Sequence, residues 1–356
     1  MAADENPRQA TIFDVARLAG VSHQTVSRVL NDLPNVRPST KARVEEAIKK
    51  LRYVPSPAAR ALVTRRSRTI GLIAAGATEY GPSSAVLYFN SAARDARWSV
   101  FTANMVDSDQ GSIRGAVEAF LRQNVEGIAV IAAQEVAVDV VAGMELSIPL
   151  VVLRAVPRHG LDTVGADQYH GARAAVQHLI SLGHSRIGHL AGPSDSVDAQ
   201  ERERGWRDEL AAHGLVATTH GIGDWSPAAG YRFGSECELT GLTAIFAAND
   251  QMAVGLMHAL RERGLAVPQD MSVIGFDDIP EAAHLAPPLT TLRQDFQRLG
   301  QDMLTTLLAR IDGGPAGSVL TAVPQLIVRS STTVPGREAP TARRVGDVPA
   351  STPRHL

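Results

Sequence analysis

The sequence predicts an all-α helix-turn-helix headpiece followed by a much larger α/β domain. The segment up to Leu51 contains short amphipathic helical patterns separated by glycine, serine and proline, which is typical of a small helical domain. From Thr69 onward, short apolar segments alternate with longer amphipathic ones, as in parallel sheets whose strands are joined by helices. A chain of 356 residues suits two or three domains, one of them with a sizeable core.

The first helix of the headpiece is expected over residues 12–19. Thr11 can cap its N-terminus, and Asp14 stands three residues further on, as in a capping box. Gly20 breaks the helix and supplies a tight turn. Local capping chemistry therefore predicts both ends of this helix.

Two further helices complete the headpiece. Ser22 is a good cap for a second helix from His23 to about Leu30, and the glycine turn before it makes the pair a helix-turn-helix. A third helix starts at Pro38, because proline is favoured at a first helical position, and continues through Leu51. Apolar residues on the inner faces of the three helices are expected to form one small core.

Seven strands are expected in the α/β domain. Seven strands over about two hundred residues suggest two sheets. The expected strands are Ile70–Ala74, Val100–Ala103, Ile128–Ala132, Leu150–Leu153, Ile187–Ala191, Ala244–Ala247 and Val273–Gly275.

Charge is distributed unevenly along the chain. Residues 1–69 hold 13 Lys and Arg against 6 Asp and Glu, a net charge of +7, whereas the remainder holds 22 against 31, a net charge of −9. A basic head on an acidic body indicates that the head alone meets a polyanion, although a solvated basic helix surface is the simpler interpretation of charge alone.

No apolar run approaches the roughly 20 residues of a membrane span, and residues 1–9 do not resemble a signal peptide. We therefore expect a cytoplasmic protein without membrane contact. The single cysteine, Cys237, excludes a disulfide framework and a cysteine zinc cluster.

The second helix carries side chains suited to reading DNA. In a helix-turn-helix, this helix enters the major groove with its N-terminal residues at the base edges. Here these positions hold His23, Gln24 and, one turn on, Arg28; glutamine can pair with adenine and arginine with guanine. A small helical unit that merely packs on another surface is the alternative. Side chains suited to phosphate contacts are Arg17, Thr25, Ser27 and Lys41.

The headpiece sequence closely resembles a known signature. The run Thr11-Ile-Phe-Asp-Val-Ala-Arg-Leu-Ala-Gly-Val-Ser-His-Gln-Thr-Val-Ser-Arg-Val-Leu-Asn31 resembles the DNA-binding signature of the lactose/galactose/purine repressor family. The resemblance extends to about Thr333. The segments most similar to the lactose branch are Leu190–Pro193, Gly223–Ser226, Ala248–Met252, Gly275–Asp278 and Pro287–Phe296.

The resemblance implies a headpiece, a hinge helix, and a periplasmic-binding-protein-like effector domain of two Rossmann-like subdomains. It also implies that residues 58–63 fold when two subunits of a homodimer meet on palindromic double-stranded operator DNA, and that Leu62 then enters the minor groove as an apolar wedge. The chain departs from the family pattern at Ser56-Pro57 and at Arg37, which can reach phosphate but cannot cap the third helix. The implied DNA contacts are Thr11, Arg17, Ser22, His23, Gln24, Thr25, Ser27, Arg28, Arg37, Lys41, Ala59 and Leu62.

Domain boundaries follow from these segments. We expect a disordered tail at 1–10, the helix-turn-helix domain at 11–54, the hinge helix and linker at 55–68, the effector-binding and dimerisation domain at 69–334, and a disordered tail at 335–356. The last tail contains one leucine, at its end, so it cannot form the leucine repeat that a lactose-type tetramer needs. The expected assembly is a homodimer.

The positions that match sugar contacts in the family carry suitable chemistry. Aromatic rings offer faces to the apolar side of a pyranose, while arginine, asparagine and aspartate offer directional hydrogen bonds to hydroxyls. Taken singly, Trp225 could be a core aromatic, Asp277 a loop cap and Arg202 a surface residue. The matching positions are Arg202, Trp225, Asn249, Asp277, Gln294 and Phe296.

Other matching positions differ from the lactose branch. Ala75, Ile131 and His170 stand where the branch has polar sugar contacts, so a simple galactoside is not the expected ligand. Together with Ala75, Gly81 and Pro82 match the opposite wall of the implied site. A ligand that touches both walls can favour one orientation of the subdomains.

The resemblance implies a transcriptional repressor whose DNA binding is relieved by a small sugar or glycoside. The alternatives are a sugar or nucleobase that acts as corepressor, and a solute receptor that does not bind DNA. An enzyme is not expected, despite the adjacent acids Asp277 and Asp278, because no nucleophile–base set, metal-ligand spacing or complete dinucleotide motif is present, and no cofactor is implied. The scattered histidines His178, His184 and His189 are expected to be capping or surface groups.

Overall fold

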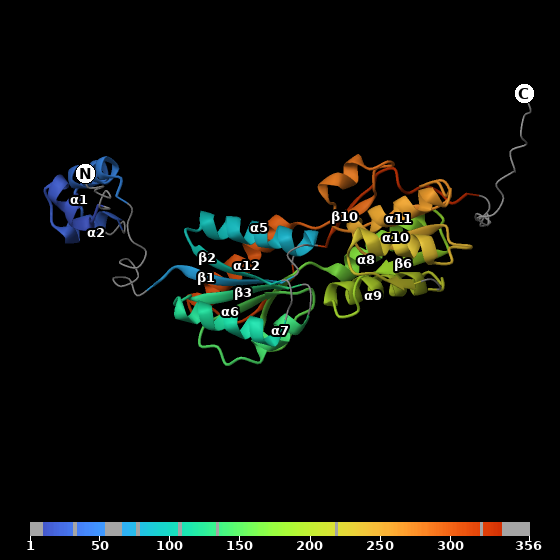
Figure 1. The fold of residues 1–356 in the computed structure, drawn as a ribbon, viewed down its shortest axis with the longest axis horizontal. Coiled ribbons are helices and arrows are strands. Elements are labelled where there is room, and N and C mark those ends of the chain that lie inside the picture. Colours follow the sequence, from blue (N-terminus) through green and yellow to red (C-terminus); the bar gives the residue numbers. More distant parts are fainter. Residues whose placement is uncertain are drawn as a thin grey trace, which may run out of the picture. The chain divides into compact units, whose positions relative to one another are not determined.

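The computed structural model describes residues 10–30, 34–53, 66–75, 79–105, 109–132, 135–217, 220–320 and 323–336. The chain forms two units, Met1–Arg68 and Thr69–Leu356 (Figure 1). The expected hinge helix at 58–63, with Ala59 and Leu62, lies outside the described residues, and so do residues 1–9 and 337–356 of the two expected tails.

The first unit is the predicted three-helix headpiece: α1 is Ile12–Ala19, α2 is His23–Leu30 and α3 is Pro38–Leu51. The predicted capping box is present, because Thr11 accepts a hydrogen bond from the Asp14 backbone and Asp14 bonds back to Thr11. Gly20 ends α1 with φ of 64°, a left-handed conformation that glycine adopts without a steric cost. Arg37 precedes α3 without a side-chain cap bond, as expected.

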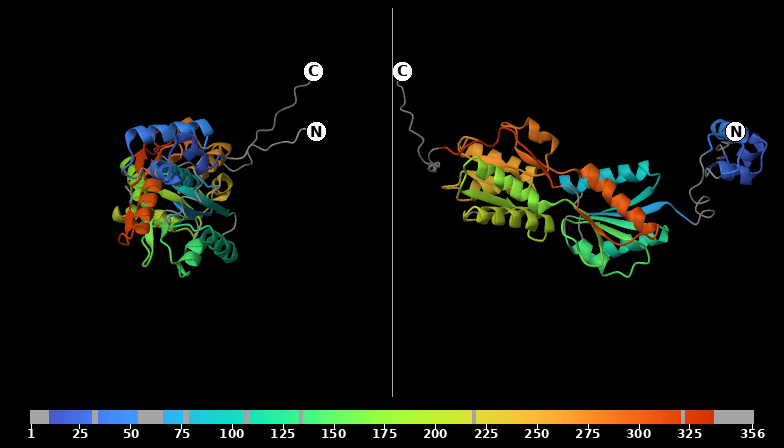
Figure 2. Two further views of the ribbon diagram at one scale, coloured as in Figure 1. Left: turned by 90° about the vertical axis from the view of Figure 1, so that its left-hand side faces the viewer. Right: turned by 180° about the vertical axis from the view of Figure 1, so that it is seen from behind.

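The first half of the second unit is a six-stranded parallel sheet in the order β11-β5-β4-β3-β1-β2. Helices α5 and α12 pack on one face of this sheet, while α6 and α7 cover the other face (Figures 1 and 2). We call this half the first subdomain. Its elements are β1 Thr69–Ala75, α5 Tyr80–Asp95, β2 Ser99–Met105, α6 Gln110–Arg122, β3 Gly127–Ala132, α7 Glu135–Ala142, β4 Leu150–Leu153, β5 Asp162–Gly165, α12 Phe296–Ile311 and β11 Ser318–Leu320.

The second half, which we call the second subdomain, contains a four-stranded parallel sheet in the order β7-β6-β8-β9 and an antiparallel pair, β10 with β12. Helices α8 and α9 pack on one face of the parallel sheet and α11 on the other. Its elements are α8 Gln168–Ser181, β6 Ile187–Ala191, α9 Val197–Ala212, β7 His220–Ile222, α10 Pro227–Glu236, β8 Ala244–Ala247, α11 Asp250–Glu262, β9 Ser272–Ile274, the 3-10 helix η1 Pro280–His284, β10 Thr291–Arg293 and β12 Gln325–Ile327.

Glycine lets α10 approach α11 closely. A Cβ atom on Gly255 would lie 1.8 Å from the carbonyl oxygen of Pro227, and one on Gly230 would lie 1.9 Å from that of Met252. The two helices can therefore pack backbone to backbone at these positions, which no side chain would allow.

The chain crosses between the subdomains three times. It passes from β5 to α8, from β10 to α12, and from β11 to β12. Because the crossing segments belong to both halves, side chains on them can contact groups from either half. Gln168 and Gln294 lie on the first two crossings.

Each of the seven predicted strands is present within two residues of its expected ends, and the two expected sheets are confirmed, with the β10–β12 pair in addition. The expected position of the histidines was wrong. His189 is fully buried and stacks on Trp206 at 5.2 Å and on Phe246 at 4.7 Å. His184 is 2% exposed and is held by hydrogen bonds to Thr243, Ser272 and Thr333.

Burial lowers the pKa of His189 to about 3, so its ring is neutral and belongs to the core. His178 is half-buried and contacts the Thr332 hydroxyl at 3.0 Å. Among the described residues, none of the helices combines the length and apolar character that crossing a membrane requires.

Candidate functional site

The headpiece presents the predicted base-reading side chains to solvent. His23, Gln24 and Arg28 are exposed on α2, whereas Val26 and Val29 are buried against α1 and α3. Gln24 and Arg28 are four residues apart and therefore share one face of the helix. This face is short, polar and basic, as a helix in the major groove requires.

Residues around the start of α2 fix its geometry. The Ser22 hydroxyl accepts a hydrogen bond from the Thr25 backbone at 3.2 Å and contacts the Thr25 hydroxyl at 3.0 Å. The exposed ring of Phe13 lies 5.2 Å from the His23 ring. Ser22 therefore acts as the predicted cap. The remaining predicted contacts are placed as follows: Arg17 and Arg37 are exposed, and Thr11, Ser27 and Lys41 are partly buried.

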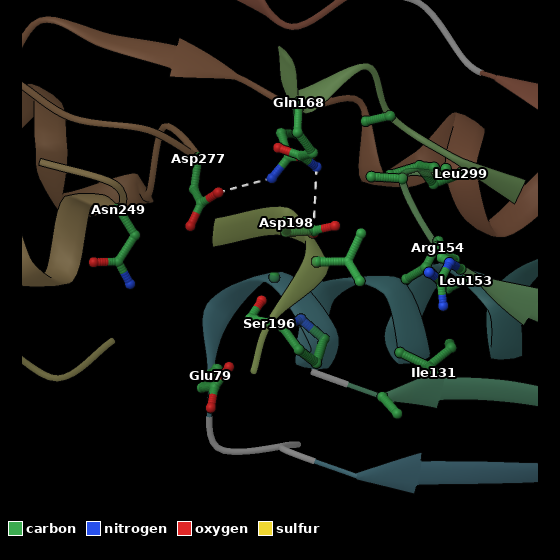
Figure 3. A pocket seen from close by; sticks show the side chains of 18 of the residues that line it. Glu79, Ile131, Leu153, Arg154, Gln168, Ser196, Asp198, Asn249, Asp277 and Leu299 are labelled. Atoms are coloured by element: carbon green, nitrogen blue, oxygen red, sulfur yellow. Dashed lines mark hydrogen bonds between the residues drawn. The ribbon is translucent and has the colours of Figure 1, made fainter. Parts of the chain in front are cut away.

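A pocket lies between the two subdomains of the second unit. It holds about 820 Å³ of empty space, part of it open to solvent, which is in the range of sites for small organic ligands. One side of its lining lies beyond the carboxyl ends of β3, β4 and β5, where parallel sheets commonly bind ligands. Figure 3 shows Ile131 and Arg154 from this side, and Asn249 and Asp277 from the second subdomain.

Arg202 is the centre of the second-subdomain wall. Its side chain is 4% exposed, and its Nε donates to Gln168 Oε1 at 2.9 Å. One terminal nitrogen donates to the Ala248 carbonyl and the other lies 3.6 Å from Asp277 Oδ1. The guanidinium also stacks over the Phe276 ring at 3.9 Å. This buried cation is therefore held rigidly on all sides.

Asp277 faces the pocket from a buried position. Gln294 Nε2 donates to its Oδ1 at 2.7 Å, and Gln294 Oε1 accepts from Gln168 at 2.9 Å. Burial raises the pKa of Asp277 to about 6, while Arg202 and the Gln294 hydrogen bond act in the opposite direction. Its backbone has φ of 110°, an uncommon conformation for a non-glycine residue. Asp277 is therefore a strained, buried acid coupled to both crossing glutamines.

Asn249 and Trp225 lie together in this wall. Asn249 caps α11 by accepting from the Met252 backbone at 2.9 Å, and it donates to the Trp225 carbonyl at 3.0 Å. Trp225 is 7% exposed and packs among apolar side chains. A Cβ atom on Gly192 would lie 2.3 Å from the Trp225 ring, so the glycine makes room for the indole. Both residues thus have structural partners and still line the pocket.

The first-subdomain wall is a mixture of apolar and charged groups. Ile131, Gly81 and Pro82 line it, and the Phe296 ring from the second crossing meets the Tyr80 ring edge-on at 5.7 Å. The charged lining residues of this subdomain are Glu79, Glu135 and Arg154.

Two of the predicted ligand contacts do not line this pocket. Ala75 is 1% exposed and packs in the core between the sheet and α6. The His170 side chain is 56% exposed, and its Nδ1 lies 2.8 Å from Asp167 Oδ2. The structure brings together the other nine predicted residues: Gly81, Pro82, Ile131, Arg202, Trp225, Asn249, Asp277, Gln294 and Phe296.

Sequence reasoning missed several charged and polar lining residues. Glu79 follows β1, Glu135 follows β3, Arg154 follows β4 and Gln168 follows β5. Asp198 lies in the first turn of α9 and accepts from Gln168 at 3.3 Å. Three of these strands were predicted, and a polar residue just past a buried parallel strand was the available signal.

Arg154 and Glu135 form an ion pair within the first-subdomain wall. Arg154 Nε also donates to the Val156 carbonyl at 2.7 Å. Glu79 has a different environment: burial raises its pKa to about 7, and repulsion from Asp277, Asp195 and Asp224 adds to the rise. Within the described ranges, no three His, Cys, Asp or Glu side chains are grouped closely enough to hold a metal ion.

Residues 11–56 match the family described as bacterial regulatory proteins, lacI family, and residues 176–332 match the periplasmic binding protein-like domain. The lactose operon repressor of Escherichia coli (strain K12) is 34% identical over 346 residues, which are 96% of this chain and 95% of that protein. The transcriptional repressor PurR of Haemophilus influenzae (strain PittEE) is 34% identical, over 90% of this chain and 98% of its own length. These relatives are transcriptional repressors, which are not enzymes.

Solved structures match over similar lengths. The lac repressor dimer bound to operator and the anti-inducer ONPF superposes with a TM-score of 0.82 at 34% identity, over 92% of this chain and 100% of that chain. The complex of the transcriptional regulator CelR with cellobiose has a TM-score of 0.66 at 30% identity, over 90% of this chain and 99% of that chain.

Proposed function

The chain belongs to the lacI family of bacterial regulatory proteins, and we propose that it represses transcription from a palindromic operator until a small sugar or glycoside fills its pocket. Family membership makes it a DNA-binding transcriptional repressor with a ligand-binding domain. The observation that carries the ligand part of the proposal is the pocket, in which Arg202, Asp277 and Trp225 meet.

These three side chains suit a sugar. Asp277 and Arg202 present directional hydrogen-bonding groups, and the Trp225 indole offers an apolar surface beside them. The similar lac repressor has been solved bound to ONPG, and the similar regulator CelR has been solved in complex with cellobiose. Ile131 replaces a polar contact on the opposite wall, which supports a ligand other than a simple galactoside.

Ligand and DNA binding are coupled through the orientation of the subdomains. A ligand can shift that orientation only by binding one arrangement more tightly than another. A typical coupling of about 1 to 3 kcal/mol changes operator affinity by roughly 5- to 150-fold. In our proposal, the orientation controls whether paired segments at 58–63 insert Leu62 at the central operator step.

The DNA-bound form is a homodimer on a twofold-symmetric site in the nucleoid of the cytoplasm. A dimer places two copies of α2 in successive major grooves, which demands a palindrome. The similar lac repressor structure is a dimer bound to operator. His23, Gln24 and Arg28 of each copy contact bases in this arrangement.

The test is an operator titration with the purified full chain, with and without a panel of mono- and disaccharides. We expect the ligand-free protein to bind its upstream palindrome and a sugar to release it. If the protein binds the operator only after a ligand is added, the ligand is a corepressor and the proposal of an inducer is wrong. A chain lacking residues 1–68 that retained operator binding would contradict the assignment of DNA binding to α2.

A further inference from the structure

Glu79 is an acid in the ligand pocket to which the described residues offer no partner. It is partly buried at the start of α5 and lines the pocket from the first subdomain. Among the described residues, its carboxylate has neither a hydrogen bond nor an ion pair. The charged groups that act on it most are also acids: Asp277, Asp195 and Asp224 of the second subdomain. Glu79 thus confronts negative charge across the pocket.

The arginines of the lining are already neutralised by protein groups. Arg202 is bound to Gln168 and Ala248 and lies beside Asp277. Arg154 is paired with Glu135. Among the described residues, none of those that line the pocket is a lysine. Both guanidinium groups of the described lining therefore already face a protein carboxylate, and neither is paired with Glu79.

Asp277 offers the pocket a second carboxylate oxygen. Its side chain is 7% exposed. Oδ1 accepts a hydrogen bond from Gln294 and lies beside Arg202, whereas Oδ2 has no hydrogen-bond partner in the described part of the chain. Figure 3 shows Asp277 and Glu79 on opposite sides of the pocket, one from each subdomain. A more than nine-tenths buried carboxylate with an open oxygen points to a ligand that carries a donor.

We propose that the ligand carries a protonated amino group, which binds between the carboxylates of Glu79 and Asp277. This rests on the proposed function, because the same pocket is the effector site. The ligand class is an amino sugar or an amino-substituted glycoside. Phosphorylated and carboxylated sugars are rejected, since they would bring further negative charge to Glu79, which no cation of the described residues compensates.

The reason for a cationic group is the free energy that a ligand must spend to desolvate Glu79. A neutral sugar would cover Glu79 and desolvate its charged form further, so binding near neutral pH would require the carboxyl to take up a proton. An ammonium between the two carboxylates makes charge-assisted hydrogen bonds to both subdomains and removes that repulsion. It would also lower the raised pKa values of Glu79 and Asp277, so binding near neutral pH should release protons.

The first test is calorimetric titration of the full chain with matched probes: glucosamine, galactosamine and mannosamine, their N-acetyl forms, their parent hexoses and the hexose 6-phosphates. At least one amine should bind about tenfold or more tightly than its N-acetyl and parent forms, as expected for a charge-assisted hydrogen bond. The phosphates should not bind. Equal or tighter binding of a neutral or phosphorylated form would overturn the proposal, as would the absence of binding by all three amines.

The second test compares Glu79→Gln with Glu236→Gln, an exposed glutamate of α10 outside the pocket. E79Q should lower the affinity for the amine about tenfold or more and should not weaken the binding of neutral forms, which then no longer cover a carboxylate, whereas E236Q should change neither. An E79Q protein that binds the amine like the wild type contradicts the proposal. A neutral hexose that releases the operator would preserve the proposed function and remove this inference. An amine that binds the protein but does not affect operator binding would preserve this inference and contradict the proposed function.

Discussion

The headpiece and the ligand pocket hold their functional side chains in opposite ways. On α2, Gln24 and Arg28 project into solvent from eight consecutive residues. In the pocket, Arg202 and Asp277 are more than nine-tenths buried and are held by groups from distant parts of the chain. An exposed side chain can be removed with an effect on its partner alone. A buried, hydrogen-bonded side chain also stabilises the fold, so its removal should lower the free energy of unfolding as well as the affinity for the ligand.

Arg202→Ala should produce the largest effect and tests this contrast directly. It removes the cation beside Asp277, leaves that buried acid, among the described residues, with only its Gln294 hydrogen bond, and takes the arginine donor from the Ala248 carbonyl. Losing one member of a buried pair typically costs about 3 to 5 kcal/mol of unfolding free energy. Urea unfolding followed by tryptophan fluorescence measures the change.

Arg154→Ala is the matched control on the other wall of the pocket. Its pair with Glu135 is more exposed, with side chains 15% and 29% accessible. Partly exposed pairs contribute roughly 1 kcal/mol or less. If both variants unfold at the same urea concentration as the wild type, the pocket is not held as tightly as its hydrogen bonds indicate.

Arg28→Ala should act on DNA binding and spare the fold. Its side chain is exposed on α2, and the loss of a bidentate base contact typically costs about 1 to 3 kcal/mol. Titrations on the operator and on single-base variants should show relaxed preference at one base pair per half-site. Arg17→Ala is the control, since loss of a phosphate contact weakens binding uniformly. Uniform weakening by R28A would remove its base-reading role.

The same contrast explains how much could be predicted from the sequence. Helices α1 and α2 were predicted because their caps and apolar spacing are local. Strands such as β4 and β8 were predicted because buried parallel strands are continuous apolar runs. Strands β5, Asp162–Gly165, and β7, His220–Ile222, are short and contain polar residues, so no run marked them.

The pocket depended on information that is not local. The family pattern supplied Arg202 and Asp277, but it also suggested Ala75 and His170, which lie outside the lining. Glu79 follows β1 at a distance from any motif. Its position opposite Asp277 depends on strand pairing and on the chain crossings, which single-residue patterns do not encode.

Asp277→Asn tests whether a buried pocket residue can be changed so that the ligand response is lost while DNA binding is kept. Asparagine tolerates the positive φ, can still accept from Gln294 and keeps an oxygen beside Arg202, so the fold should be retained at a smaller cost in stability than Arg202→Ala causes. Without the charge, the ligand loses its second-subdomain partner and with it a coupling of about 1 to 3 kcal/mol. We expect a repressor that binds its operator but does not respond to ligand. Operator titrations across the sugar panel measure this, and an unchanged ligand response would contradict it.

The smallest effect is expected from Glu79, the pocket acid that has no partner among the described residues, and it concerns the pH dependence of stability. Its pKa is raised from 4.5 to about 7 in the folded protein, chiefly by burial. The folded state therefore retains a proton that the unfolded state releases, so the unfolding free energy should fall as pH rises from about 4.5 through 7. Because the side chain is partly exposed, the loss should be about 1 to 2 kcal/mol, well below the limit set by the full shift.

Glu79→Gln isolates this contribution, because glutamine keeps the size of the side chain and has no proton to lose in this range. The unfolding free energy of E79Q relative to the wild type should increase between pH 4.5 and 7 and then stay constant. Asp277, whose pKa is raised to about 6, changes stability with the same sign in both proteins, so the difference between them reports Glu79 together with its repulsion from Asp277. Urea unfolding of the ligand-free proteins across this range measures the difference, with Glu236→Gln as the exposed control. If the unfolding free energies of E79Q and the wild type change with pH in the same way throughout, the Glu79 carboxylate is solvated and is not repelled by the acids of the second subdomain.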